Sequence, residues 1–192
     1  MKKFEFFLLL GLLCLCPKLS AQHIPTRVFP TPQEIEVTNQ PFISADFRIT
    51  GLKSVDSVAI SFLKEILPFG STKKALPIKI SFLKDKQAVL QRWGAYPLKI
   101  TATSITIEIK DDRSLFYAVQ TIKQLVSKTN DGKIKLYPCM ITDYPDVAYR
   151  GTVEGFYGTP WSFDDRIEQL RFYGKIKMNT YIYGPKDDPY HS

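Results

Sequence analysis

Apolar residues recur with two different periods along residues 24–144, and these periods predict a mixed α/β unit. In "SVDSVAISFLKEILPFG" the apolar positions follow helical spacing until Pro68 and Gly70, so residues 55–67 are predicted to form an amphipathic helix. Period-2 alternation with many β-branched residues predicts strands at 76–83, 96–101 and 104–110, the last two forming a hairpin. The proline-containing run "VFPTPQEIEV" predicts an extended entry followed by an edge strand.

A second helix is predicted in "DDRSLFYAVQTIKQLVSK". Asp111 or Asp112 can cap its N-terminus, and this adjacent acid pair is interpreted as cap and surface. The buried stripe of the helix is formed by Leu115, Ala118, Val119, Ile122 and Val126. "NDG" at residues 130–132 then turns the chain.

A domain boundary is predicted near Tyr144–Pro145, because the residue before a proline favours extended backbone. Beyond it the pattern reads strand (148–153), helix (162–175) and strand (179–183). Ser162 and Asp165 resemble a capping box at the start of this helix, whose buried face is expected to consist of Phe163, Ile167 and Leu170. This is one βαβ unit, the building block of a parallel sheet or a (β/α) barrel. A barrel takes about 250 residues, so the second domain is expected to be incomplete within this chain.

The first 21 residues are interpreted as a secretory signal peptide. Lys2 and Lys3 precede an apolar stretch, and the segment closes at a small-residue cleavage pattern ending in Ala21. The stretch is shorter than the roughly 20 residues of a membrane span, so no integral membrane segment is predicted. A lipid anchor on Cys14 or Cys16 is the alternative, which the bulky residues before each cysteine disfavour.

Removal of the signal peptide changes the charge and the cysteine count. It takes three of the 26 basic and one of the 19 acidic residues, which leaves a net charge of +5. Cys139 is then the only cysteine, and this excludes an internal disulfide and a cysteine-based metal site. The remaining lysines are scattered among acids, as in "STKKALPIKISFLKDK", so nucleic acid is not an expected partner.

The candidate chemistry lies after the two strands of the βαβ unit, in "EGFYGTPWS" and "YGPKDDPYHS". Loops at the C-terminal ends of parallel strands converge over one face and carry the sites of such folds. Aromatic rings that could wall in a sugar, glycines that admit a ligand, and polar groups for its hydroxyls together suit a carbohydrate. The aromatic residues are Phe156, Tyr157, Trp161 and Tyr183, and the polar ones are Lys186, Asp187 and Asp188.

Two of these features allow more than one interpretation. Glu154 could act as a base or a metal ligand, or could form a salt bridge in the barrel mouth with Arg150 or Lys186. Asp187 and Asp188 form an adjacent acid pair that invites a catalytic reading. With His191 they also resemble a metal constellation, but one imidazole and two carboxylates are an incomplete ligand set, and no metal is predicted.

The motifs of both parts of the chain resemble those of a known enzyme family. "RGTVEGFYGTPWS" followed by "YGKIKMNTYIYGPKDDPYHS" resembles the opening of the catalytic barrel of glycoside hydrolase family 84, the family of bacterial O-GlcNAcase-type β-N-acetylglucosaminidases. Upstream, "PTPQEI", "DDRSLFYAVQTIKQL" and "ITDYPDVAYRG" resemble the small α/β domain that precedes the barrel in hexosaminidases. After the signal peptide (1–21), the resemblance implies a hexosaminidase-type N-terminal α/β domain with a mixed sheet (22–145) and the first βαβ of a truncated (β/α)8 TIM barrel (146–192).

The resemblance also implies an activity and the roles of residues. Family members release terminal β-linked N-acetylglucosamine with retention, through an oxazoline formed by the substrate's own acetamide. They use two adjacent aspartates of a later strand, so no catalytic residue is assigned here and the pair is expected downstream of Ser192. Lys186 and the backbone oxygen of Gly155 correspond to ligands of the sugar, with Glu154, Phe156 and Tyr157 in support. Asp187 and Asp188 are then expected to orient Lys186 rather than to catalyse. Neither metal nor cofactor is implied.

Two other functions are compatible with the sequence. A related hexosaminidase or hyaluronidase could share the N-terminal domain, and a short secreted protein could bind carbohydrate through Phe156, Tyr157, Trp161 and Lys186 without cleaving it. In every case the predicted partner is a glycan or glycoprotein that contains N-acetylglucosamine. Export to the periplasm, the cell surface or the medium follows from the signal peptide, whereas the sequence leaves the oligomeric state open.

Overall fold

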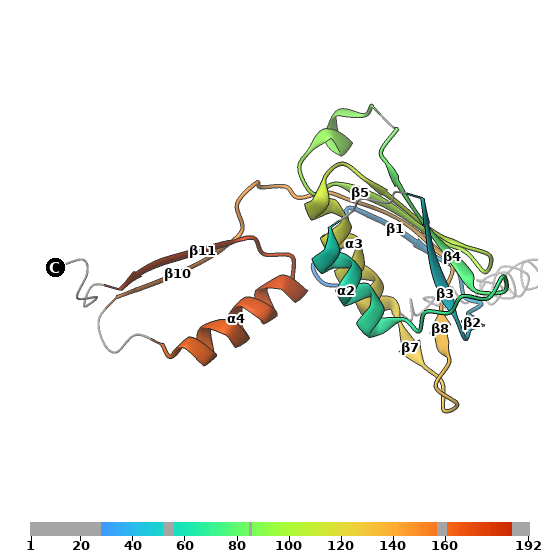
Figure 1. Cartoon of the computed structure of the whole chain (residues 1–192). Coiled ribbons are helices and arrows are strands. Elements are labelled where there is room, and N and C mark those ends of the chain that lie inside the picture. Colours follow the sequence, from blue (N-terminus) through green and yellow to red (C-terminus); the bar gives the residue numbers. More distant parts are fainter. Residues whose placement is uncertain (1–27, 52–55, 85, 157–160, 186–192) are drawn as a thin grey trace, which may run out of the picture.

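A computed structural model describes residues 28–51, 56–84, 86–156 and 161–185, and Figure 1 shows their arrangement. The predicted signal peptide lies outside these residues. The first part of the chain forms a six-stranded sheet in the order β1-β9-β5-β6-β4-β3. Its strands are β1 (Glu34–Val37), β3 (Phe47–Gly51), β4 (Leu76–Phe82), β5 (Tyr96–Ile100), β6 (Ile105–Ile109) and β9 (Cys139–Asp143).

The sheet is mixed, as the sequence predicts. Strands β3, β4 and β6 run parallel to one another, whereas β6, β5, β9 and β1 pair antiparallel. The predicted hairpin is formed by β5 and β6, and β1 lies at the edge of the sheet. A smaller sheet has the order β2-β8-β7 and consists of β2 (Phe42–Ser44), β8 (Ile134–Leu136) and β7 (Ser127–Lys128).

Both helices of this part, α2 (Ser57–Ile66) and α3 (Asp112–Leu125), cover the same face of the large sheet (Figure 1). Asp111 caps α3 in a capping box with Ser114, which confirms its predicted role. Buried side chains alternate with half-buried or exposed ones along β4, β5, β6 and β9, and this alternation underlies the period-2 pattern that predicts β4, β5 and β6. The fully buried members include Phe47, Leu63, Ile78, Leu98, Ile107 and Leu115.

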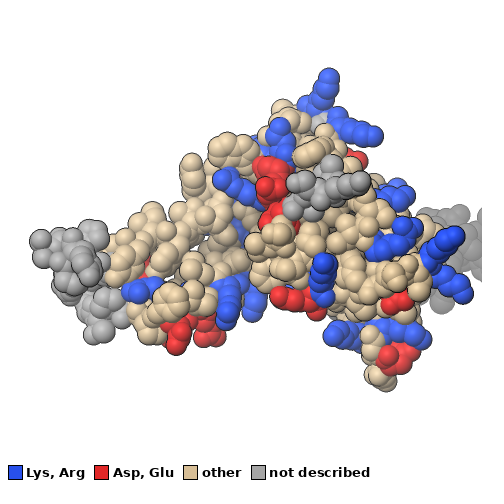
Figure 2. Space-filling model, in the orientation of Figure 1, with Lys and Arg blue, Asp and Glu red and all other residues tan. Residues whose placement is uncertain are grey.

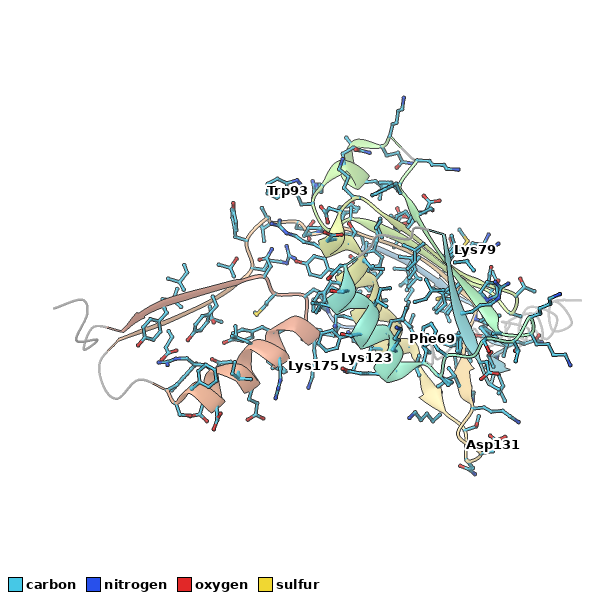
Figure 3. The ribbon with its side chains drawn as sticks, in the orientation of Figure 1. Phe69, Lys79, Trp93, Lys123, Asp131 and Lys175 are labelled. Atoms are coloured by element: carbon cyan, nitrogen blue, oxygen red, sulfur yellow. The ribbon has the colours of Figure 1, made fainter. Side chains whose placement is uncertain are left out.

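The opposite face of the large sheet carries polar residues. Lys79 of β4 projects from it (Figure 3), and a short 3-10 helix, η2 (Ala88–Gln91), precedes β5. Figure 2 shows Lys and Arg side chains spread over the visible face of the six-stranded unit, with acidic side chains between them. The charge is therefore dispersed on this face rather than gathered into one basic patch.

The second part of the described chain is a βαβ unit that projects from one end of the first (Figure 1). Strands β10 (Gly151–Phe156) and β11 (Thr180–Pro185) pair in parallel, and α4 (Phe163–Lys175) connects them. Ser162 and Asp165 form the predicted capping box of α4. Strand β10 begins at Gly151, three residues later than predicted. The two residues before it that could pair bond to the side chain of Asn179 instead: the N–H of Arg150 donates to its Oδ1, and the carbonyl of Ala148 accepts from its Nδ2.

Two of the three residues predicted for the buried face of α4 are exposed, and the third, Ile167, is half-buried. The side chains of Phe163 and Leu170 are 71% and 41% exposed. The helix instead turns Arg166 and Tyr173 toward the strands, where Arg166 bonds Glu154 and Tyr173 accepts from the Thr152 hydroxyl at 2.9 Å. The face of α4 that bonds to β10 therefore carries Arg166 and Tyr173 and lies next to the apolar stripe of the helix.

Candidate active site

The C-terminal ends of β10 and β11 lie side by side, and this brings the two predicted motifs to one edge. The parallel register pairs Glu154 with Tyr183, Gly155 with Gly184 and Phe156 with Pro185. Lys186 follows Pro185 directly in the sequence. The predicted site residues Tyr157, Lys186, Asp187 and Asp188 lie outside the described residues, as does His191, and only the backbone of Phe156 is described. Among the predicted residues, the structure therefore describes the backbone of Gly155 and the side chains of Glu154, Trp161 and Tyr183, the last two of which are exposed.

Glu154 is the best-connected carboxylate of the βαβ unit. It is 8% exposed and receives two hydrogen bonds from Arg166, Nε to Oε2 at 2.7 Å and Nη2 to Oε1 at 2.8 Å. The backbone N–H of Trp161 donates to Oε1 at 3.1 Å, and the hydroxyl of Tyr181 donates to Oε2. A bidentate guanidinium–carboxylate pair of this kind fixes geometry as well as charge. Glu154 thus ties together β10, the start of α4 and β11.

This geometry corrects one of the two predicted partners of Glu154, Arg150, whereas the other, Lys186, lies outside the described residues. Its side chain points to the face covered by α4, and its cation is Arg166, not Arg150. The guanidinium of Arg150 is used elsewhere: it donates to the carbonyl of Val147 at 2.7 Å and to the hydroxyl of Tyr117 at 2.9 Å. Arg166 in turn stacks over the ring of Tyr183, with 4.6 Å from Cζ to the ring centroid.

The electrostatics of Glu154 favour a permanently ionised carboxylate. The hydrogen bonds from Arg166 lower its pKa most, those from Tyr181 and Trp161 add to this against the opposing effect of burial, and the pKa is about 2. A base with such a pKa is a poor acceptor of protons near neutrality. Glu154 therefore holds Trp161, Arg166 and Tyr181 together beside β10, and a role as general base does not fit it.

Acid sensitivity follows from that low pKa. The folded value of about 2 lies below the ordinary value of 4.5, so Glu154 stabilises the fold fully above about pH 5, and this contribution is lost as the pH falls from 4.5 toward 2. We expect urea unfolding of Glu154→Gln to depend less steeply on pH in this window than unfolding of the wild type. Glu168→Gln, on the exposed surface of α4, is the control and should keep the wild-type slope. Equal slopes for wild type and Glu154→Gln would refute the assignment.

Arg166 and Tyr181 are site residues that the sequence patterns do not single out. One signal was available for Arg166: a cation one turn from the N-terminus of a helix opposes the helix macrodipole and calls for a local anion. Tyr181 carries no such signal, because its partner is fixed by the parallel register of β11 with β10.

The described residues contain no group of three or more His, Cys, Asp and Glu side chains arranged to hold a metal ion. Among the helices that the structure describes, none has the length and apolarity to cross a membrane.

Each of the two parts of the chain matches a family model. Residues 25–144, well over half of the sequence, match the family model for glycosyl hydrolase family 20, domain 2. The chain belongs to this family. Residues 150–192 match a second model, described as beta-N-acetylglucosaminidase, and these residues hold both strand-end motifs. A family 20 domain 2 followed by the start of a β-N-acetylglucosaminidase is the order of a family 84-like N-terminal portion, as the resemblance implies.

Individual proteins that are similar to this chain support both family matches. It is 54% identical over 41 residues to the protein O-GlcNAcase of Rattus norvegicus, covering 21% of this chain and 4% of that protein. It is 29% identical over 165 residues to the N,N'-diacetylchitobiase of Vibrio harveyi, covering 84% of this chain and 18% of that protein. The solved structure of CpGH84B superposes with a TM-score of 0.74 at 31% identity, over 86% of this chain and 31% of that one. The chain therefore spans less than a third of the length of these relatives.

Proposed function

We propose that the full-length protein is an exported glycosidase that removes terminal β-linked N-acetylglucosamine. The observation that carries the proposal is the match of residues 150–192 to the β-N-acetylglucosaminidase model. These residues contain the two loops that leave the adjacent ends of β10 and β11. The relatives are much longer than this chain, so the proposed active protein includes a complete (β/α) barrel of which β10, α4 and β11 form the opening.

The proposed reaction proceeds with retention and with assistance from the substrate. The acetamide oxygen attacks the anomeric carbon, the glycosidic bond breaks, and a carboxylic acid protonates the leaving oxygen. A second carboxylate takes up the acetamide proton as the oxazoline forms. Water then opens the ring and restores the acetamide. Both carboxylates are assigned to an aspartate pair on a later barrel strand, whereas Gly155 and Lys186 hold the sugar hydroxyls.

Hydrolysis of p-nitrophenyl β-N-acetylglucosaminide by the purified full-length protein tests the proposal. We expect release of N-acetylglucosamine with the β-anomer appearing first. A slower reaction is expected when fluorines on the acetyl group withdraw electrons from the attacking oxygen. Cleavage of polymeric hyaluronan in place of the aryl glycoside would identify a hyaluronidase. Binding of N-acetylglucosamine in calorimetry without any hydrolysis would identify a binding protein, and either result would reject the proposal.

Lys186→Ala tests the proposed sugar contact. Hydrogen bonds to a charged group contribute about 1 to 3 kcal/mol, so we expect the variant mainly to raise KM by the corresponding factor. Lys175→Ala is the matched control, because Lys175 is an exposed lysine at the end of α4 (Figure 3). Unchanged KM and kcat in Lys186→Ala would remove this lysine from the site.

A further inference from the structure

Lys177 has an unusual backbone and an unusual environment. It lies two residues beyond the end of α4, after the C-cap residue Ile176, and has a φ of 61°, the only positive φ among the non-glycine residues that the structure describes. Its side chain is also buried, with 5% of the residue exposed. Helices commonly end on a left-handed residue, but that position favours glycine, and lysine is rarely buried without a partner. A lysine in both situations at once points to a specific use of its side chain.

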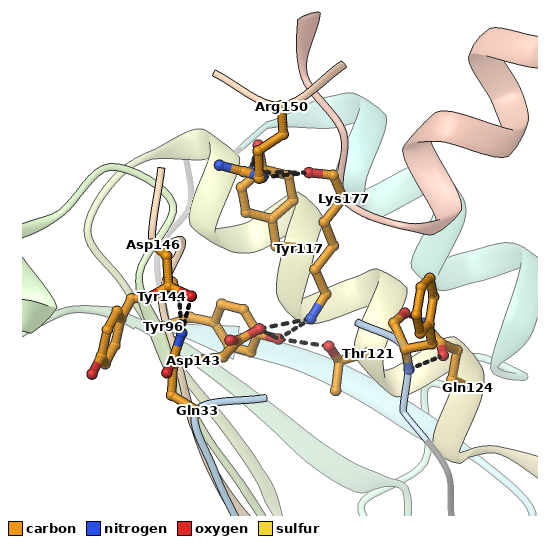
Figure 4. A network of polar contacts seen from close by, with 11 residues as sticks. Gln33, Tyr96, Tyr117, Thr121, Gln124, Asp143, Tyr144, Asp146, Arg150 and Lys177 are labelled. Carbon is orange, nitrogen blue, oxygen red and sulfur yellow. Dashed lines mark hydrogen bonds and ion pairs between the residues drawn. The ribbon is translucent and has the colours of Figure 1, made fainter. Parts of the chain in front are cut away.

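The ammonium group of Lys177 enters the six-stranded unit (Figure 4). Nζ donates to Oδ2 of Asp143 on β9 at 2.7 Å and to the hydroxyl of Tyr96 on β5 at 2.8 Å. Tyr96 donates to the same carboxylate oxygen at 2.9 Å, and it lies 2.6 Å from the hydroxyl of Thr121 on α3. Because Tyr96 has one proton and gives it to Asp143, Thr121 must donate to Tyr96. The network thus joins three elements of the first unit to the end of α4.

The backbone of the same residue binds the entry of the βαβ unit. The carbonyl oxygen of Lys177 accepts from Nε and Nη2 of Arg150, at 3.2 and 3.0 Å. The carbonyl of Arg150 accepts from the N–H groups of Asn179 and Thr180, at 2.8 and 3.0 Å. Arg150 precedes β10 and Thr180 begins β11, so these bonds fix the starting points of both strands. Lys177 therefore connects the six-stranded unit to both strands of the βαβ unit.

From this geometry we propose that Lys177 is a positioning residue for the sugar site. Its bonds to Asp143 and Tyr96 set the placement of the β10–β11 pair against the six-stranded unit. The parallel register then transmits this placement from Gly151 and Thr180 at one end to Gly155 and Gly184 at the other. The inference rests on the proposed function, because the site at those strand ends is the one that would bind N-acetylglucosamine.

A merely space-filling role would not require this residue. Well-packed apolar side chains of similar volume often replace a buried ion pair without loss of stability, so packing alone gives no reason for the charges. A cavity of about 190 Å³ lies along the joint and is lined by Tyr117, Asp143, Arg150 and Lys177 among others. Apolar contacts are non-directional and would allow shifts beside this space, whereas charge-assisted hydrogen bonds hold one geometry.

The double variant Lys177→Met/Asp143→Leu in the full-length protein is the main test. It removes both charges, so neither is left buried without a partner. We expect a melting temperature close to that of the wild type and a kcat/KM for p-nitrophenyl β-N-acetylglucosaminide lower by about 10- to 100-fold, since displacements near 1 Å can cost 100-fold. A folded double variant with kcat/KM within twofold of the wild type would overturn the proposal.

Lys177→Gly separates the side chain from the turn. Glycine adopts the left-handed conformation freely, so the helix end is preserved while the ammonium group is lost. We expect a loss of kcat/KM similar to that of the double variant, whereas wild-type kinetics would show that the turn alone matters. The control is Lys133→Met, which breaks an exposed ion pair of 2.8 Å with Asp131 at the tip of the β7–β8 hairpin (Figure 3). It should keep wild-type kinetics.

Hydrogen exchange distinguishes failure of this inference from failure of the proposed function. In the double variant we expect faster exchange over residues 150–154 and 179–183, with strands β4 and β6 unchanged. If the wild type hydrolyses none of the substrates but this local exchange increases, the joint stands and the proposed function fails. If exchange over both segments matches the wild type, the positioning role is refuted whether or not the protein is active.

Discussion

Replacing Gly151 with alanine will separate β10 from β11. A Cβ atom at Gly151 would lie 1.6 Å from the carbonyl oxygen of Thr180 and 2.4 Å from its carbonyl carbon. Backbone atoms of a paired strand cannot turn away as the end of a flexible side chain can, so the two strands must move apart. The strands approach closely at this position because the carbonyl of Arg150, the residue before Gly151, accepts from the N–H groups of both Asn179 and Thr180.

The expected cost of Gly151→Ala is about 3 kcal/mol or more in the free energy of unfolding, at or above the upper range for overpacked sites. Urea unfolding of the full-length protein measures it. Gly155→Ala and Gly184→Ala are matched controls in the same strand pair. A Cβ at Gly155 would have its nearest neighbours at 3.5 Å, an ordinary contact, and at Gly184 it would meet nothing within 4 Å. Both controls should unfold within about 1 kcal/mol of the wild type. If Gly151→Ala unfolds with them, the close approach at this position is refuted.

The helices and strands that the sequence predicts could be found because buried positions recur along them with the period of each element. Ile78 and Ile80 of β4, and Leu115, Ala118 and Ile122 of α3, are buried as their spacing requires. The strands β2, β3, β7 and β8 were not predicted. Strand β9 was not predicted either, although Cys139 and Ile141 are buried and alternate with Met140 and Thr142. The five residues of β9 lie between Pro138 and Pro145, and flanking prolines are typical of a loop. Only the pairing with β1 and β5 distinguishes this segment as a strand.

The candidate site was predictable in position but not in its internal contacts. Parallel strands joined by a helix must bring their C-terminal ends together, so the two motifs share an edge on topology alone. The partner of Glu154 depends on which face of α4 meets the strands, and the apolar stripe of Phe163 and Leu170 predicted another face. Likewise, Asp143 and Lys177 are 34 residues apart in the sequence, and no local pattern predicts the contact between their side chains.

Replacing Asp143 alone with leucine will destabilise the protein strongly. Lys177 would stay in its buried position without its anion, and Tyr96 would lose the acceptor for its proton. Burial already lowers the pKa of Lys177, and Asp143 is the main influence that opposes this. Breaking a buried pair by removing one partner typically costs about 3–5 kcal/mol, and we expect a loss of this size in urea unfolding of the full-length protein.

The same reasoning predicts a strong dependence of one substitution on the other. Lys177→Met should also cost about 3–5 kcal/mol, because it leaves the carboxylate of Asp143 buried without its cation. The double variant should lose far less than the sum of the two, since no uncompensated charge remains. The exposed pair of Asp131 and Lys133 provides the contrast: solvent already hydrates both groups, so Asp131→Leu should leave the unfolding midpoint unchanged. Additive losses at Asp143 and Lys177 would mean that the two side chains stabilise the fold independently, which contradicts the joint network.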